Sequence, residues 1–225
     1  MNRSTVYVKA FDEPPVDRRE ILRYAGVGSE LPELHAILEE CLAELSGRLR
    51  YQLCYRRFPV SFLEKGVDLG FAVTSSETVR WRLCGCQSIV LFGATIGLEL
   101  DRLIARYSHS APTKALLLQA IGTERIESLC DAFCQSLSVE LAEEGRLCRS
   151  RFSPGYGDFP LELQETILEA LDGSRRLGVS LTQSMMMTPS KSVTAIVGIA
   201  DQGGTTSVQE NCAVCDQANC AYRRI

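Results

Sequence analysis

A long run of apolar residues at helical spacing, from Thr123 to about Glu144, constrains the fold of this 225-residue chain most strongly. The apolar positions recur every three or four residues, so they lie on one face of a helix. They are Ile126, Leu129, Cys130, Phe133, Leu137 and Leu141. Gly145 follows directly and is a suitable end for this helix. A helix with one apolar face has to bury that face against another layer of its domain.

Shorter helices and strands are expected on both sides of this helix. Residues 31–47 carry a second apolar stripe at helical spacing, and Glu77–Leu83 and the residues after an Ala94–Thr95 turn are expected to form two more helices. Asp158 can cap a further helix that has Pro160 in its first turn. Strand patterns occupy four runs, which are Tyr51–Phe62, Ser88–Phe92, Val179–Met187 and Ser192–Ala200.

The order of these elements predicts the fold class. Helices and strands intermix without strict βαβ alternation, which favours an α+β fold, with a single domain whose mainly antiparallel sheet is flanked by helices. Residues 1–29 are expected to form an N-terminal arm, residues 30–200 the domain, and residues 201–225 a cysteine-rich C-terminal tail.

The composition excludes several classes of protein. With 45% hydrophobic residues the chain can build a core, so it is not a disordered protein. Its 24 Lys and Arg residues are outnumbered by 28 Asp and Glu residues, which argues against a nucleic-acid partner. The first residues lack the apolar core of a signal peptide, and no run of about 18 apolar residues suggests a membrane span. We therefore expect a cytoplasmic protein with no membrane partner.

Few side chains suit acid–base or nucleophilic catalysis. The two histidines, His35 and His109, lie on the first amphipathic helix and in a polar loop. The glycine-rich and nucleophile motifs of hydrolases, kinases and dehydrogenases do not occur. The sequence therefore offers binding loops more readily than catalytic groups.

Ten cysteines are many for a chain of this length. Because structural disulfides are rare in a reducing compartment, these thiols need other roles. Cys41, Cys130 and Cys134 are expected to pack in the core as small apolar residues. The spacing C-x2-C-x4-C in the tail suits a zinc ion or an iron–sulfur cluster, with Cys84 or Cys86 as the candidate fourth ligand. Thiols packed on the domain, or a labile disulfide, are the alternatives for the three tail cysteines, which are Cys212, Cys215 and Cys220.

The segment from Arg151 to Pro160 has the composition of a ligand-binding loop. Arg151 can hold a carboxylate through two parallel hydrogen bonds. Gly155 lets a ligand approach the backbone closely, and Tyr156 offers an aromatic face and a hydroxyl. Such a loop suits a zwitterionic amino-acid ligand, while a plain turn before a helix is the alternative interpretation.

This loop resembles the activation domain of cobalamin-dependent methionine synthase. The pattern R-x-x-P-G-Y covers Arg151–Tyr156, and Pro160 follows four residues later. The resemblance continues upstream through Ser128–Phe133, and downstream through Leu177–Met187 and the segment from Pro189 to Ala195. Together these motifs span residues 120–200 in the order and spacing of the family.

The resemblance implies an S-adenosylmethionine site. Arg151 matches the arginine that, with the backbone after it, holds the methionyl part of the ligand in this family. Asp131 matches an acidic position, occupied by Glu in the family, that faces the ligand's ammonium or sulfonium group. A solvated helix charge is the alternative role for Asp131. The residues expected to bind the ligand are Asp131, Arg151, Ser153, Pro154, Gly155 and Tyr156.

Two positions depart from the family pattern. Gly145 stands where the family has a second acidic residue, and Glu143 and Glu144 are only near substitutes. The family's tyrosine after the last matched strand falls in residues 202–207, which contain no tyrosine. The ligand pocket is therefore expected to be altered. The chain is most similar to stand-alone members of the family, which lack the methyltransferase and cobalamin modules.

The resemblance implies an accessory subunit of a methionine synthase system. Such a subunit binds S-adenosylmethionine and supports the reductive methylation of cobalamin that is carried by a separate methionine synthase or corrinoid methyltransferase, with an electron donor as a further partner. The alternative is a non-catalytic module that senses S-adenosylmethionine or docks on a corrinoid protein, and that carries a metal in its tail.

Overall fold

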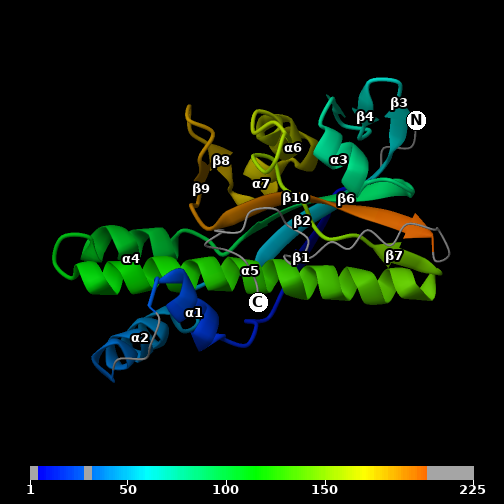
Figure 1. Ribbon diagram of the computed structural model, residues 1–225. Coiled ribbons are helices and arrows are strands. Elements are labelled where there is room, and N and C mark those ends of the chain that lie inside the picture. Colours follow the sequence, from blue (N-terminus) through cyan, green and yellow to red (C-terminus); the bar gives the residue numbers. More distant parts are fainter. Residues whose placement is uncertain (1–4, 28–31, 202–225) are drawn as a thin grey trace.

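A five-stranded antiparallel sheet and one long helix, α5 (Pro112–Glu143), form the centre of the structure (Figure 1). The computed structural model describes residues 5–27 and 32–201. The strands lie in the order β1-β2-β6-β10-β7, and every neighbouring pair is antiparallel. The α+β fold with a mainly antiparallel sheet is therefore confirmed. The strands are β1 (Tyr7–Ala10), β2 (Gln52–Pro59), β6 (Cys86–Thr95), β7 (Arg146–Cys148) and β10 (Ser192–Asp201).

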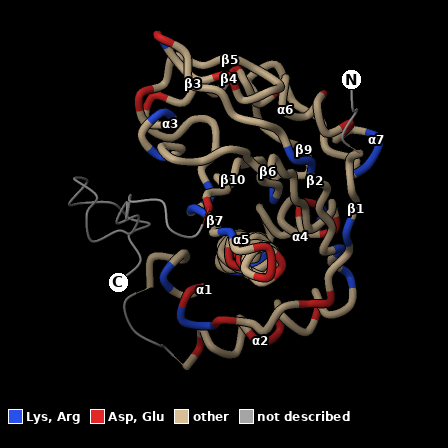
Figure 2. The backbone as a smooth tube through the Cα atoms, turned by 90° about the vertical axis from the view of Figure 1, so that its right-hand side faces the viewer, with Lys and Arg blue, Asp and Glu red and all other residues tan. Residues whose placement is uncertain are grey.

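Helices cover both faces of this sheet. α5 crosses one face with α4 beside it, and α1 and α2 pack on the side of α5 that faces away from the sheet (Figure 2). α3, α6 and α7 lie over the opposite face (Figure 1). These helices are α1 (Arg18–Tyr24), α2 (Pro32–Leu45), α3 (Glu77–Arg82), α4 (Glu99–Tyr107), α6 (Leu163–Leu171) and α7 (Gly173–Leu177).

Two small sheets flank the second face. One has the order β3-β4-β5, and the other is the hairpin β8-β9 directly before β10. Their strands are β3 (Ser61–Leu63), β4 (Gly66–Asp68), β5 (Val73–Thr74), β8 (Ser180–Leu181) and β9 (Met187–Thr188). The apolar run Val179–Met187, which predicts one strand, therefore forms only the β8 strand and the first residue of β9.

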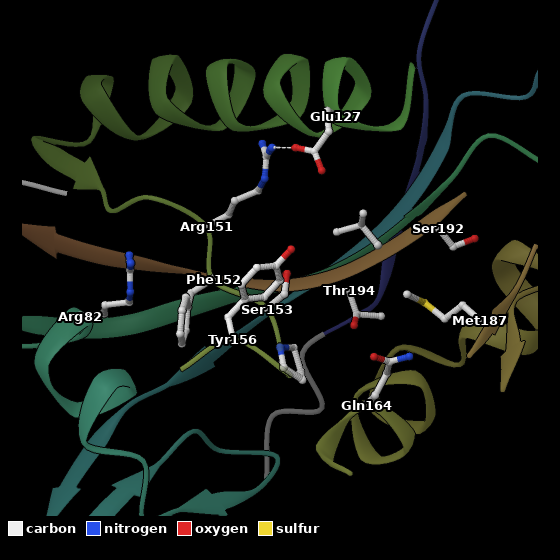
Figure 3. Close-up of a pocket in the computed structure, with 12 residues that line it drawn as sticks. Arg82, Glu127, Arg151, Phe152, Ser153, Tyr156, Gln164, Met187, Ser192 and Thr194 are labelled. Atoms are coloured by element: carbon white, nitrogen blue, oxygen red, sulfur yellow. Dashed lines mark hydrogen bonds and ion pairs between the residues drawn. The ribbon is translucent and has the colours of Figure 1, made fainter. Parts of the chain in front are cut away.

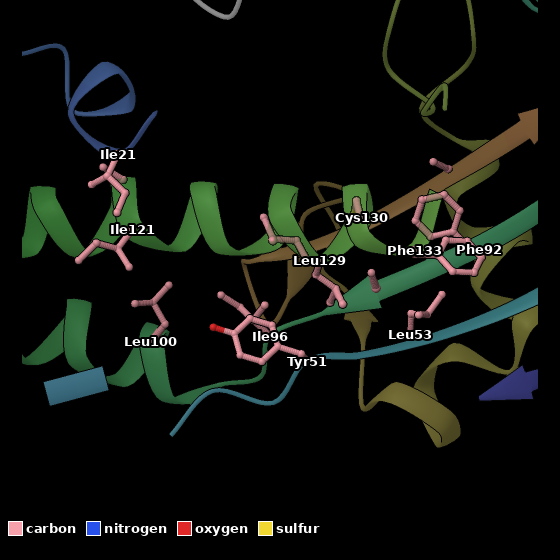
Figure 4. Close-up of a cluster of buried hydrophobic side chains, with 14 of the residues drawn as sticks. Ile21, Tyr51, Leu53, Phe92, Ile96, Leu100, Ile121, Leu129, Cys130 and Phe133 are labelled. Atoms are coloured by element: carbon pink, nitrogen blue, oxygen red, sulfur yellow. The ribbon is translucent and has the colours of Figure 1, made fainter. Parts of the chain in front are cut away.

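The main sheet separates two apolar clusters. On the α5 side, Leu129, Cys130 and Phe133 share one cluster with Phe92 of β6, and the rings of Phe92 and Phe133 lie 5.0 Å apart between centroids (Figure 4). On the other side, Ile89 and Leu91 of the same strand pack with side chains of α6 and α7. Because β6 is buried on both faces, its sequence is continuously apolar instead of alternating.

The long helix extends further toward the N-terminus than its apolar stripe predicts. α5 begins at Pro112, eleven residues before Thr123, and Leu117, Leu118 and Ile121 are buried in this first part. Gly122 interrupts the sequence pattern, since glycine is a weak helix former. A Cβ at this position would stand 2.0 Å from Leu100 of α4, so the glycine permits the close approach of α4 to α5.

Two local predictions are wrong. Ala94 and Thr95 do not turn the chain but are the last residues of β6, paired with Val193 and Ser192 of β10. Asp158 does not cap the helix that follows it, because α6 begins only at Leu163. Its carboxylate instead accepts hydrogen bonds at the start of α3, a helix about eighty residues earlier in the chain.

A buried ion pair fastens the chain before α1 to α5. Arg125 is 1% exposed and Glu124 is 2% exposed, and Arg125 Nε and Nη2 donate to the Glu124 carboxylate at 2.5 and 2.6 Å. The same guanidinium donates to the backbone oxygens of Pro14 and Pro15 at 2.5 and 2.7 Å. Glu124 Oε1 also accepts from the backbone N–H of Asp17, the N-cap of α1, at 3.1 Å. These bonds place α1 against the long helix.

The core role expected for three cysteines is confirmed. Cys41 and Cys130 are buried, and Cys134 is half-buried against the same cluster. In residues 5–27 and 32–201, no helix combines the length and the apolar character that a bilayer crossing requires.

Candidate functional site

A pocket of about 430 Å³ opens at the edge of β10, beneath the loop that begins at Arg151 (Figure 3). Its volume lies within the range of small-molecule sites, roughly 300–1,000 Å³. Side chains of five segments line it: the end of α3, the middle of α5, the loop after β7, the start of α6, and the chain from β9 into β10. Four of the six predicted ligand-binding residues are in the lining, namely Arg151, Ser153, Pro154 and Tyr156.

The loop over the pocket is tied to β10 at its start. Phe152 and Ile196 exchange backbone hydrogen bonds, both at 2.9 Å, beyond the end of β7. The chain then leaves the sheet, and Gly155 N–H donates to Phe159 O at 2.8 Å and closes the loop. Gly155 has φ +88°, a conformation that few other residues adopt, and it does not line the pocket. Its role is therefore the shape of the loop.

Asp158 anchors the far end of the loop to α3. Its carboxylate accepts from Ser76 Oγ at 2.5 Å, from Glu77 N–H at 2.7 Å and from Thr78 N–H at 3.1 Å. Hydrogen bonds from Ser76 and Thr78 hold the pKa of Asp158 well below its ordinary value. The carboxylate thus caps α3 from outside that helix. Inside the loop, the rings of Phe152 and Phe159 stack at 5.8 Å between centroids.

Arg151 is the electrostatic centre of the site. Its Nη1 donates to Asp131 Oδ1 at 2.5 Å, and its Nη2 donates to Glu127 Oε2 (Figure 3). Burial opposes the charge of the guanidinium, but the nearby Cys130, Glu127 and Asp131 outweigh it and raise the pKa of Arg151. Arg151 is therefore a permanent cation held between two carboxylates of α5.

Glu127 is a site residue that sequence reasoning missed. It precedes Asp131 by one helical turn, so both carboxylates lie on the same face of α5. This spacing of four residues is visible in the sequence and connects Glu127 with the predicted ligand residue Asp131. The two near substitutes for the second acidic position do not reach the pocket. Glu144 instead pairs with Arg146 at 3.3 Å beyond the end of α5, and Glu143 is exposed.

A second, acidic pocket adjoins the first on the other side of this ion pair. Its volume is about 310 Å³, and Glu127 lines both pockets. The rest of the lining comprises Asp131, Ser128, Tyr24 of α1 and three further carboxylates. These three carboxylates are those of Asp17, Glu20 and Glu124. The arrangement favours a cationic group next to Arg151.

A second guanidinium, that of Arg82, lines the main pocket beside Phe152. The Arg82 guanidinium lies over the Phe152 ring, with its Cζ at 4.5 Å from the ring centroid (Figure 3). Stacking of this kind holds an arginine side chain in place. Arg82 comes from α3, which reaches the loop through Asp158, so only the folded chain brings the two residues together.

The metal site predicted for the tail is not part of the described structure. Cys212, Cys215 and Cys220 lie outside the described residues. Of the two candidates for a fourth ligand, Cys84 is exposed, whereas Cys86 is a buried residue of β6 beside Gly198 of β10. In the described part of the chain, no three side chains of His, Cys, Asp or Glu gather as a metal site would require.

Comparison with known proteins supports the fold. No family model matches the chain, and no curated protein sequence matches it. Among solved structures, the chain is similar to the MetH reactivation domain bound to AdoHcy, with a TM-score of 0.62. The similarity covers 88% of this chain and 79% of that chain at 16% sequence identity. The resemblance that the sequence motifs indicate is thus confirmed at the level of the fold.

Proposed function

We propose that this chain binds S-adenosylmethionine between the Arg151 loop and α5, and that it supports the reductive methylation of cobalamin on a separate methionine synthase or corrinoid methyltransferase. The observation that carries the proposal is the guanidinium of Arg151 between Glu127 and Asp131, at the wall of a ligand-sized pocket. The fold supports it, because the solved MetH reactivation domain that shares this fold was obtained with AdoHcy.

The ion pair of Arg151 suits the amino-acid end of this ligand. A carboxylate can take one edge of the Arg151 guanidinium through two hydrogen bonds. The ammonium group of the same ligand can bind Glu127 or Asp131, so that each carboxylate still has a cationic partner. When a zwitterion binds, one ion pair between Arg151 and an α5 carboxylate is replaced by two ion pairs with the ligand. No buried charge is left unpaired, so the main cost of separating a buried ion pair is avoided.

The protein's own contribution is to position the ligand. Methyl transfer from the sulfonium and the electron that accompanies it belong to the corrinoid and its reductant on the partner, and a bound ligand held in one orientation lowers the barrier by proximity. The site is open on the loop side, where the Tyr156 side chain is 66% exposed. A partner protein can reach a ligand methyl group from this side.

The first test is calorimetric titration of the full chain with S-adenosylmethionine and with S-adenosylhomocysteine. We expect binding by the wild type, and a weakening of about 2–5 kcal/mol in Arg151→Ala, because the carboxylate of the ligand loses its cationic partner. Arg175→Ala is the matched control, since Arg175 is exposed on α7 away from the pocket. Wild-type protein that binds neither compound at millimolar concentration would contradict the proposal.

A second assay separates the accessory subunit from a module that only senses the ligand or docks on a corrinoid protein. The observation that favours the second function is the altered acidic position, since Gly145, Glu143 and Glu144 contribute nothing to the pocket. The assay mixes the protein with S-adenosylmethionine, a corrinoid methyltransferase and a reductant, and follows methylcobalamin by its absorption. Ligand binding without any gain in methylcobalamin identifies a sensing or docking module.

A further inference from the structure

Two buried polar side chains lie at the end of the main pocket that is opposite Arg151. Gln164 of α6 is 5% exposed and Thr194 of β10 is 3% exposed, yet both line the pocket (Figure 3). Polar groups at this depth are normally paired within the protein. The side-chain donors and acceptors of these two residues that have no partner in the protein therefore indicate which ligand groups the pocket can bind.

Gln164 presents a hydrogen-bond acceptor. Its side-chain amide contacts the backbone oxygen of Met185 at 3.1 Å, and because a carbonyl oxygen only accepts, the contacting atom is the amide nitrogen. This bond fixes the orientation of the amide group. Within the described residues, Gln164 Oε1 has no hydrogen-bond partner, so it is an acceptor of fixed direction at the pocket wall.

Thr194 presents a hydroxyl and an open strand edge. Its hydroxyl has no hydrogen-bond partner in residues 5–27 and 32–201. If the register that pairs Phe152 with Ile196 continued, the next hydrogen-bonded pair would be Pro154 opposite Thr194. Proline has no N–H to donate, so the ladder ends there, and no described residue bonds the backbone groups of Thr194 that point to this edge.

We infer that Gln164 and Thr194 form hydrogen bonds with the edge of the ligand's purine ring that carries the exocyclic amino group. These bonds make the pocket selective for adenine. The inference rests on the proposed function, which supplies an adenosyl ligand. Adenine carries an exocyclic N–H donor next to a ring nitrogen that accepts. Gln164 Oε1 accepts from the amino group, and the Thr194 hydroxyl donates to the ring nitrogen. Apolar side chains for the faces of the ring are present in the same lining, from Pro154, Met187 and Val193.

The two residues have different effects on specificity. Hypoxanthine has an oxygen in place of the amino group. This oxygen is a hydrogen-bond acceptor and would face Gln164 Oε1, a second acceptor whose direction is fixed, so no hydrogen bond could form. The Thr194 hydroxyl can rotate, and it can donate or accept as the ligand requires. Discrimination between the two bases is therefore assigned to Gln164, whereas Thr194 contributes affinity for both.

The test is titration of the full chain with S-adenosylhomocysteine and S-inosylhomocysteine. We expect the wild type to prefer the adenosyl compound by about tenfold or more, because the inosyl compound leaves a buried acceptor without a donor. Gln164→Met should remove most of this preference. Thr194→Val, which preserves the shape of the side chain, should weaken both compounds by about threefold to tenfold. Gln135→Met and Thr113→Val are the controls, since both residues are exposed on α5.

The possible results are distinct. Equal binding of the two compounds by the wild type, or an undiminished preference in Gln164→Met, overturns the inference and leaves the proposed function intact. Binding of neither compound by the wild type contradicts the proposed function itself. If Gln164→Met does not fold because Met185 loses its bond, the wild-type preference and the Thr194→Val titration still decide the matter.

Discussion

Replacing Arg125 with methionine tests whether the buried pair with Glu124 holds the N-terminal arm in place. Methionine matches the length of the arginine stem but donates no hydrogen bonds. The variant loses two bonds to Glu124 and the two bonds to the carbonyl groups of Pro14 and Pro15. It also leaves the Glu124 carboxylate, whose side chain is 3% exposed, without its cation.

The expected cost is large for a domain of this size. Removing one partner from a buried ion pair costs about 3–5 kcal/mol, compared with a total free energy of unfolding of about 5–15 kcal/mol for most domains. One kcal/mol corresponds to about 2–4 °C at this chain length, so Tm should fall by about 6–20 °C. The double variant Glu124→Gln/Arg125→Met buries no charge and should recover at least about 1 kcal/mol.

Urea denaturation followed by far-ultraviolet circular dichroism measures these differences. Arg102→Met is the matched control, because Arg102 pairs with Glu99 on the exposed face of α4 and should change the free energy of unfolding by less than about 1 kcal/mol. A loss below about 1 kcal/mol in Arg125→Met would refute the reasoning. A double variant as unstable as the sum of its single variants would show that the pair is not coupled.

Two further predictions concern the loop anchor and the tail. Since the pKa of Asp158 is depressed in the folded protein, its contribution to stability is present above the ordinary carboxyl pKa of about 4 and is lost as the pH falls below it. In urea titrations between about pH 7 and pH 2, Asp158→Asn should therefore be less stable than the wild type at neutral pH and should converge with it in acid; parallel curves would contradict this role. Elemental analysis of anaerobically purified protein should find zinc or iron, and the metal should be absent after serine replaces Cys212, Cys215 and Cys220; a folded wild type without metal would contradict the tail site.

Local patterns in the sequence predict much of the fold and part of the site. The apolar stripes of α2 and α5 depend on neighbours three and four residues away, so they are readable without the structure. The family motif predicts that Arg151 and Asp131 belong to one ligand site, and the structure places the two side chains in direct contact.

The remainder depends on contacts between distant segments. Asp158 has the local pattern of a helix cap, but the helix that it caps begins at Glu77 and reaches it only through the folded sheet. Gln164 and Thr194 lie thirty residues apart on α6 and β10, and no spacing rule connects them. The sequence around Gly122 indicates a break in a helix, because it does not show that Leu100 of α4 packs directly against this position.

The open edge of β10 has a consequence for self-association. Unpaired N–H and C=O groups on a strand edge are a template for a strand of another chain, and this is a common route to aggregation. Here Phe152 pairs at one end of the gap, and the register would place Pro154, which cannot extend the ladder, at the next hydrogen-bonded position. The open part of the edge is therefore too short for strand exchange. The same proline that leaves backbone groups free for a small ligand also denies them to a second copy of the protein.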